Sequence, residues 1–137
     1  MSRIQTAFER LAGERRKALI PFITAGDPDA GLTVPLMQAL VDAGADIIEL
    51  GVPFSDPMAD GPTIQRASER ALAGGMTLKK VLQRVTAFRT LDDRTPVVLS
   101  SSGAISSRDP VQIFGYPVFG SDSFEDAGST TTLQIFG

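Results

Sequence analysis

The chain has 137 residues, 42% of them hydrophobic and 21% charged, a composition typical of one globular domain. It contains no cysteine and no histidine, which excludes disulfides and thiolate nucleophiles and leaves acid–base chemistry at neutral pH to carboxylates, lysines and Tyr116. Its 13 basic and 16 acidic residues give a net charge of −3, so we expect no nucleic acid and no anionic membrane as partner.

The apolar runs of the sequence are all short. None approaches the roughly 20 residues that a helix needs to cross a bilayer. Residues 1–17 are too rich in charge for a signal peptide. We therefore expect a cytoplasmic protein.

The first part of the chain alternates between helical and strand patterns. Ser2 can cap a short amphipathic helix that ends at Gly13, and the apolar run Ala18–Thr24 predicts a buried strand. Leucines recur at helical spacing over 29–43, and the apolar residues of 46–50 predict a second strand.

A long loop is predicted over 51–61, where prolines and glycines interrupt regular structure. Helices are predicted over 62–73 and 77–90, and 96–99 reads as a third strand. Apolar strands that alternate with helices indicate an α/β fold with a parallel sheet covered on both faces. The two common architectures of this kind are the open doubly wound sheet and the (β/α)8 barrel. A barrel needs about 250 residues, so this chain could hold about half of one.

The composition of the chain changes near Leu99. Residues 100–137 are rich in Ser, Gly and Thr and carry one basic residue against four acidic ones. We therefore treat 1–99 as one unit and the rest as a divergent tail. Within this tail 100–108 is predicted to be irregular, and 110–128 predicts a helix only weakly.

Glu49 is a candidate catalytic carboxylate. It lies near the end of the second predicted strand, and active-site groups of parallel α/β folds gather at the carboxyl ends of strands. Its apolar flanks favour a carboxyl group that can both give and take a proton. The pattern alone favours the structural alternative, in which Glu49 forms an ion pair with an arginine.

Two aspartates, Asp56 and Asp60, lie on the loop that follows, where Pro53 and Pro57 stiffen the chain. Such a loop can hold carboxylates over a pocket. Because Asp60 also precedes Pro62 at a helix entry, local sequence favours a plain capping role for it. Two carboxylates without histidine or a third clustered acid give only a weak metal signal, so we expect no metal.

The run from Glu49 to Gly61 closely resembles the tryptophan synthase alpha chain family, as do Pro21–Pro28 and 43–46 before it. This long pattern of fixed spacing is far more specific than a lone glycine-rich loop, and the resemblance covers about residues 1–99. It implies a TIM-type (β/α)8 barrel, of which this chain holds about half. It also implies a lyase of tryptophan biosynthesis that cleaves indole-3-glycerol phosphate into indole and glyceraldehyde 3-phosphate.

The resemblance implies no cofactor for this chain. The implied partner is the beta chain, a pyridoxal-phosphate enzyme that receives indole through a tunnel in a heterotetramer. By matching positions, Glu49 is the catalytic acid–base, and Asp60 accepts a hydrogen bond from the indole N–H. Phe22 and Leu99 match apolar walls around the indole ring. The implied partner-binding positions are Pro53, Phe54, Asp56 and Pro57.

After Leu99 the family pattern fades, and the sequence up to Gly137 does not include the lid and the glycine-rich loops that hold the substrate phosphate in this family. Three hypotheses follow. The chain is an active lyase subunit completed by another chain, or a truncated, inactive alpha chain that keeps the partner-facing loop 53–57. The third is a half-barrel that self-associates through exposed sheet edges.

Overall fold

The structure, a computed structural model, describes residues 2–55, 60–101, 112–113, 116–117 and 131–133. Its helices are α1 (Arg3–Gly13), α2 (Thr33–Asp42), α3 (Pro62–Ala73) and α4 (Leu78–Arg89), with a 3-10 turn η1 (Ala30–Leu32) before α2. Its strands are β1 (Phe22–Thr24), β2 (Ile48–Gly51), β3 (Val97–Ser101), β4 (Gln112–Ile113), β5 (Tyr116–Pro117) and β6 (Thr131–Leu133).

The strands β1, β2 and β3 are adjacent and parallel, which confirms the sheet predicted from the sequence. The first strand is shorter than predicted and begins only at Phe22. Before it, the carbonyls of Leu19 and Pro21 accept hydrogen bonds from Asp46 and Glu49 at 2.9 Å, but Pro21 has no N–H to donate in return. Before Phe22 this segment therefore accepts backbone hydrogen bonds from the neighbouring strand segment, and regular two-way pairing begins only after the proline.

The strand β6 occupies the fourth position and runs antiparallel to β3, with Leu133 opposite Leu99. All strands of a TIM-type barrel are parallel, so this position departs from the barrel pattern. The weak helix predicted over 110–128 is wrong for β4 and β5, which form a separate antiparallel pair. Their isoleucine and tyrosine favour extended backbone.

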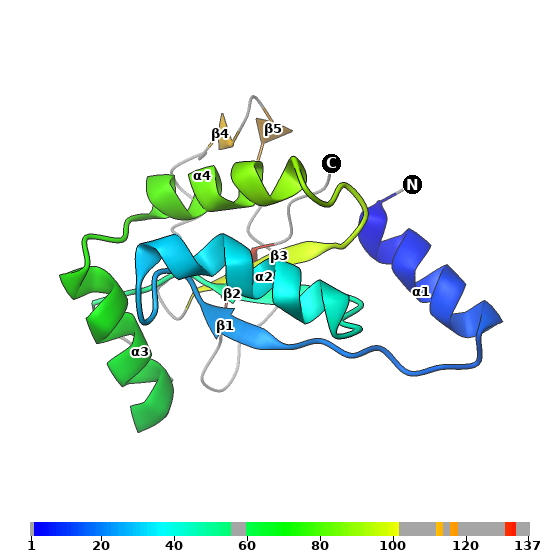
Figure 1. The fold of residues 1–137 in the computed structure, drawn as a ribbon, viewed down its shortest axis with the longest axis horizontal. Coiled ribbons are helices and arrows are strands. Elements are labelled where there is room, and N and C mark those ends of the chain that lie inside the picture. Colours follow the sequence, from blue (N-terminus) through cyan, green and yellow to red (C-terminus); the bar gives the residue numbers. More distant parts are fainter. Residues whose placement is uncertain (1, 56–59, 102–111, 114–115, 118–130, 134–137) are drawn as a thin grey trace.

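Two helices, α2 and α4, pack against each other and cover one face of the sheet (Figure 1). Side chains alternate between the two faces of a strand. The helix-facing row holds Leu50 and Leu99, which are fully buried together with Phe88 of α4 and Met37 of α2. This apolar layer is the core of the described part of the chain.

Local signals in the sequence explain where the helices begin and end. The Ser2 hydroxyl accepts a hydrogen bond from the Gln5 N–H at the start of α1, and Thr77 does the same for α4. After α2 the chain turns at Gly44, whose φ of +107° is disfavoured for other residues. Gly44 thus marks the end of this helical segment in the sequence.

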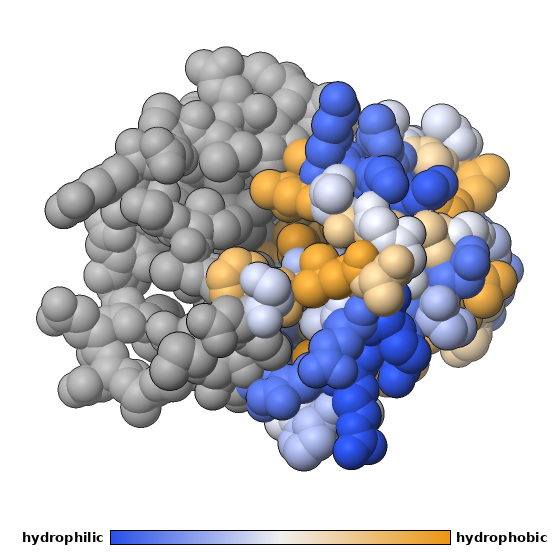
Figure 2. All heavy atoms as spheres, turned by 90° about the vertical axis from the view of Figure 1, so that its left-hand side faces the viewer, coloured by the Kyte–Doolittle hydropathy of each residue, from blue (hydrophilic) through white to orange (hydrophobic). Residues whose placement is uncertain are grey.

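The carboxyl ends of the parallel strands β1, β2 and β3 lie with α3 at one end of the molecule, and α1 lies at the other (Figure 1). Figure 2, which looks at the end with α3, shows a band of hydrophobic residues between two hydrophilic regions. The exposed apolar residues on segments that follow β1 and β2 include Leu32 and Phe54.

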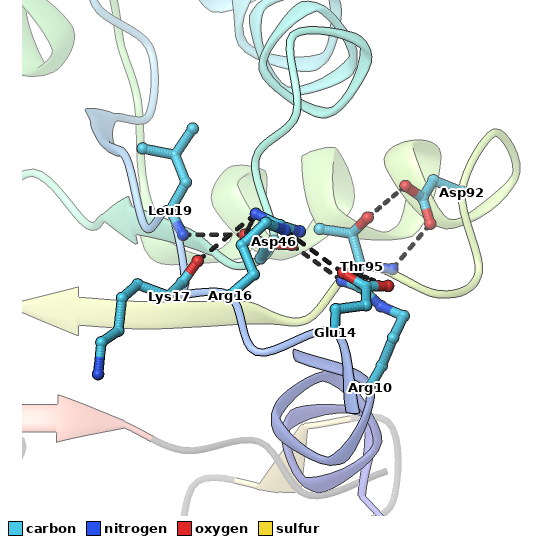
Figure 3. A network of polar contacts seen from close by, with 8 residues as sticks. All are labelled: Arg10, Glu14, Arg16, Lys17, Leu19, Asp46, Asp92 and Thr95. Atoms are coloured by element: carbon cyan, nitrogen blue, oxygen red, sulfur yellow. Dashed lines mark hydrogen bonds and ion pairs between the residues drawn. The ribbon is translucent and has the colours of Figure 1, made fainter. Parts of the chain in front are cut away.

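At the amino ends of the strands, Arg10, Glu14, Arg16 and Asp46 form a network that we call the amino-end clamp (Figure 3). The Asp46 carboxylate, with 3% of its side chain exposed, accepts from Arg16 at 2.6 and 2.9 Å, from Arg10 at 2.9 Å and from the Leu19 N–H at 2.9 Å. The Arg16 guanidinium above all holds the pKa of Asp46 well below its usual range, against the effect of burial. The clamp fastens α1 to the start of β2.

Candidate active site

The face of the sheet opposite the core helices carries the candidate site. In the register of the sheet, Glu49 of β2 lies between Phe22 of β1 and Val98 of β3. Because neighbours in register point to the same face, these three side chains form one row. The next row on this face, toward the carboxyl ends, holds Thr24, Gly51 and Ser100.

The Glu49 side chain is half-buried in this row. Within the described part of the chain, its carboxylate has no hydrogen bond and no ion pair. The arginine pair that the sequence pattern favoured is therefore not found among these residues. In the register of the sheet, Glu49 thus lies between an aromatic and an aliphatic residue.

Phe22 lies beside Glu49, and 38% of the residue is exposed. Its ring reaches past Glu49 toward Gly51: an ideal Cβ built on Gly51 would lie 2.6 Å from the Phe22 Cζ. The structure thus brings two residues of the predicted site, Phe22 and Glu49, onto one surface.

The prediction that Leu99 lines the site with Glu49 is wrong. Leu99 pairs with Leu50 and is 1% exposed in the core, on the opposite face of the sheet. A shift of one residue along a strand changes the face, so Val98 holds the position next to Glu49 and Ser100 the following one. Sequence alone did not give this alternation, because it depends on the register with β2.

Asp60 is half-buried and lies two residues before α3. Gly61 is the N-cap residue of α3, and no side chain caps this helix. The backbone carbonyl of Asp60 accepts from the Gln65 side chain at 2.7 Å. The capping role favoured by local sequence is therefore wrong, and the Asp60 carboxylate has no hydrogen bond or ion pair with the described residues.

The predicted partner-binding loop is only partly described. Pro53 is buried and Phe54 is 38% exposed, so the two residues have opposite surroundings. Asp56 and Pro57 lie outside the described residues.

Hydrogen bonds fix the loops around the site. The Ala25 N–H donates to the Gly51 carbonyl at 2.9 Å, and the Val52 N–H donates to the Ser100 carbonyl at 2.7 Å. Asp27, after β1, accepts two bonds from Arg70 of α3, at 2.6 and 3.0 Å. Sequence analysis missed this pair, and no local signal links residues that lie 43 positions apart.

The described residues contain no group of three or more acidic residues placed to hold a metal ion. None of the helices described is long and apolar enough to cross a membrane.

A sequence model of the tryptophan synthase alpha chain matches residues 8–112, which is more than half of the chain. The chain belongs to the tryptophan synthase alpha chain family. The alpha chain of Dechloromonas aromatica is 71% identical over 119 residues, covering 87% of this chain and 42% of that relative. The alpha chain of Burkholderia thailandensis is 58% identical over 135 residues, covering 98% and 48%.

Solved structures of the tryptophan synthase alpha family share the fold. Tryptophan synthase subunit alpha from Legionella pneumophila has a TM-score of 0.73 and 55% identity, over 74% of this chain and 38% of that one. An aminoacrylate-bound tryptophan synthase from M. tuberculosis gives 0.68 and 42%, over 74% and 40%. These matches confirm the predicted barrel family, here as a partial sheet with helices. The chain spans less than half the length of the curated relatives named above.

Proposed function

We propose that this chain is a lyase subunit of tryptophan biosynthesis that acts on indole-3-glycerol phosphate, with Glu49 as its catalytic acid–base. The observation that carries the proposal is the Glu49 carboxylate, which has no ion pair among the described residues and lies between Phe22 and Val98. Family membership supplies the reaction class, a retro-aldol cleavage to indole and glyceraldehyde 3-phosphate.

The reaction needs a group that moves one proton in each direction. The indole carbon that carries the side chain takes up a proton, and the adjacent side-chain hydroxyl loses one as it becomes a carbonyl. The electron pair of the broken carbon–carbon bond returns to the indole ring, so atoms and charges balance. One carboxyl group beside the scissile bond can perform both transfers, and Glu49 supplies it in this proposal.

Two other residues complete the proposed site. While the ring carbon is protonated, positive charge develops on the indole nitrogen, and a carboxylate that accepts its N–H stabilises this charge. We assign that role to Asp60, whose carboxylate does not cap α3. The exposed face of Phe22 offers an apolar surface for the flat ring.

We also propose the beta chain as partner and the cytoplasm as location. The exposed Phe54 in the loop after β2 supports the partner, because an exposed aromatic side chain is a common anchor at protein interfaces. We propose that Pro53, Asp56 and Pro57 contribute to the same contact.

The test is indole release from indole-3-glycerol phosphate, measured for the chain with and without a beta chain. Glu49→Gln should lower the rate by about 100-fold or more, because the amide keeps the shape but cannot exchange a proton. Asp60→Asn should also slow turnover. The thermal unfolding midpoint should change little in both variants, since neither carboxylate holds an ion pair in the described structure.

Glu9→Gln is the matched control, because Glu9 is an exposed carboxylate of α1 whose one hydrogen bond among the described residues comes from the Gln5 side chain. It should leave turnover unchanged. If Glu49→Gln turned over as fast as the parent, the catalytic assignment would fail. If the parent released no indole even in the presence of the beta chain, this would instead support the hypothesis that the chain is a truncated, inactive alpha chain.

A further inference from the structure

Gly51 and Phe22 fit together more closely than any side chain at position 51 would allow. An ideal Cβ on Gly51 would lie 2.6 Å from Cζ and 2.9 Å from Cε2 of the Phe22 ring. The next nearest atom, the Ile23 carbonyl oxygen, is 3.4 Å away. The ring therefore lies across the backbone of β2 in the space that a methyl group would fill.

The backbone of Gly51 does not itself require glycine. The glycines with positive φ in the described residues are Gly26, Gly44 and Gly75, and Gly51 is not among them. Alanine is thus compatible with the backbone here, and what obstructs it is the far end of the Phe22 side chain. Glycine at position 51 therefore leaves open the space that the Phe22 ring occupies.

We propose that Gly51 is a positioning residue that seats the Phe22 ring as a flat platform for the indole part of the substrate. This inference rests on the proposed function and deepens it, because it identifies what sets the depth of the aromatic surface beside Glu49. A methyl group on residue 51 would push the ring tip by about 1 Å to restore ordinary contact distances. The displaced ring would occupy space above the platform, where the indole would lie.

Such a displacement matters because the flat ring must lie beside a fixed carboxylate. Glu49 is the register neighbour of Phe22, so a ring that tilts out of its seat changes the height of the substrate relative to that carboxylate. Reacting groups have to be held within a fraction of an ångström for efficient proton transfer. Gly51 therefore belongs to the binding surface although it offers no side chain.

The test is the affinity of the full chain for indole, followed by NMR titration, for the parent, Gly51→Ala, Phe22→Ala and the double variant. We expect Gly51→Ala and Phe22→Ala each to weaken binding by roughly fivefold, the value of one stacked aromatic contact. The double variant should bind as Phe22→Ala does, because without the ring the methyl group displaces nothing. Gly13→Ala, with open space around it, is the control and should bind as the parent does.

Three outcomes would overturn the inference. The first is a double variant whose loss of indole affinity equals the sum of the two single losses. The others are unchanged indole binding by Gly51→Ala and no indole binding by the parent. Thermal unfolding of the same variants is an independent readout in case Gly51→Ala folds poorly. We expect Gly51→Ala to destabilise the parent and not the Phe22→Ala background, and equal destabilisation in both would also refute the role of the ring. Equilibrium binding needs no turnover, so an inactive chain that shows this coupling contradicts only the proposed function.

Discussion

Two carboxylates three positions apart on one segment have opposite surroundings. Asp46 receives hydrogen bonds from two guanidinium groups and one backbone N–H, whereas Glu49 receives none from the described residues. The positions of the two residues explain the difference. Asp46 lies two residues before β2, within reach of Arg10 and Arg16, whereas Glu49 is the second residue of β2 and not near its carboxyl end as the sequence predicted, and it lies between Phe22 and Val98 in the sheet. The residue type alone does not distinguish them.

Asp46→Asn should destabilise the fold by about 2 kcal/mol at neutral pH. This loss is smaller than the loss expected on breaking a fully buried ion pair, because both arginines remain partly exposed. The pKa of Asp46 is lower in the folded state than its ordinary value of 3.8. The ionised carboxylate therefore contributes fully to the free energy of unfolding above pH 3.8, and this contribution is lost as the pH falls below 3.8. The stability gap between parent and variant should therefore narrow from about pH 5 downward. Thermal unfolding at several pH values measures this gap.

Asp93→Asn provides the control for that experiment, because the exposed Asp93 side chain has no hydrogen bond or ion pair among the described residues. Its unfolding midpoint should match the parent at each pH. A gap for Asp46→Asn that stayed constant down to pH 3 would contradict the assignment of the clamp to an ionised carboxylate.

At the scale of elements, two hydrogen bonds between Arg70 and Asp27 hold α3 to the loop after β1. This helix begins two residues after Asp60, so its position also affects the position of a proposed site residue. The Arg70 side chain is 54% exposed, and exposed pairs contribute little to global stability. The pair therefore acts on the placement of one helix more than on the stability of the fold.

Arg70→Gln should change the free energy of unfolding by less than about 1 kcal/mol, yet amide hydrogen exchange should become faster in α3 than in α2. Hydrogen exchange followed by mass spectrometry measures both helices in one sample. The control is Arg66→Gln, since the exposed Arg66 of α3 makes no ion pair with any described residue. Equal acceleration in all helices would argue against a local tether.

The helices and strands could largely be predicted from local sequence, whereas contacts between distant residues could not. The bounds predicted for α3 match the structure, because proline is favoured at the first position of a helix and glycine directly after its end, and Pro62 and Gly74 occupy these positions. The face on which Leu99 lies depended on the register with β2, which no local pattern supplies. The clamp joins residues 30 and 36 positions apart, so its pairing was likewise not visible in the sequence.

At the scale of the whole molecule, β1 has no strand on its outer side among the described residues. The carbonyls of Leu19 and Pro21 point toward β2, so by alternation the backbone groups of Ile20 and Phe22 point outward. Both residues are also exposed, at 46% and 38%. A bare edge with apolar side chains is a template for pairing with another chain.

We therefore expect the chain to self-associate, and light scattering at tens of micromolar measures this. Ile20→Lys should shift the population toward monomer, because an edge lysine opposes strand pairing. Leu91→Lys is the control: Leu91 is 63% exposed but lies after α4, away from this edge. A parent that stays monomeric, or an equal effect of both lysines, would contradict pairing through β1.

The contrast between Asp46 and Glu49 predicts how this protein responds to selection. Because Glu49 forms no ion pair with the described residues, an uncharged residue there should leave the yield of folded protein nearly unchanged, whereas changes at Asp46 should lower it. A mutant library sorted only for cellular abundance would then retain Asp46 and accept other residues at position 49. The same library sorted for growth without tryptophan would keep both, provided that the chain is active. Two carboxylates three residues apart would thus report separately on selection for folding and selection for activity.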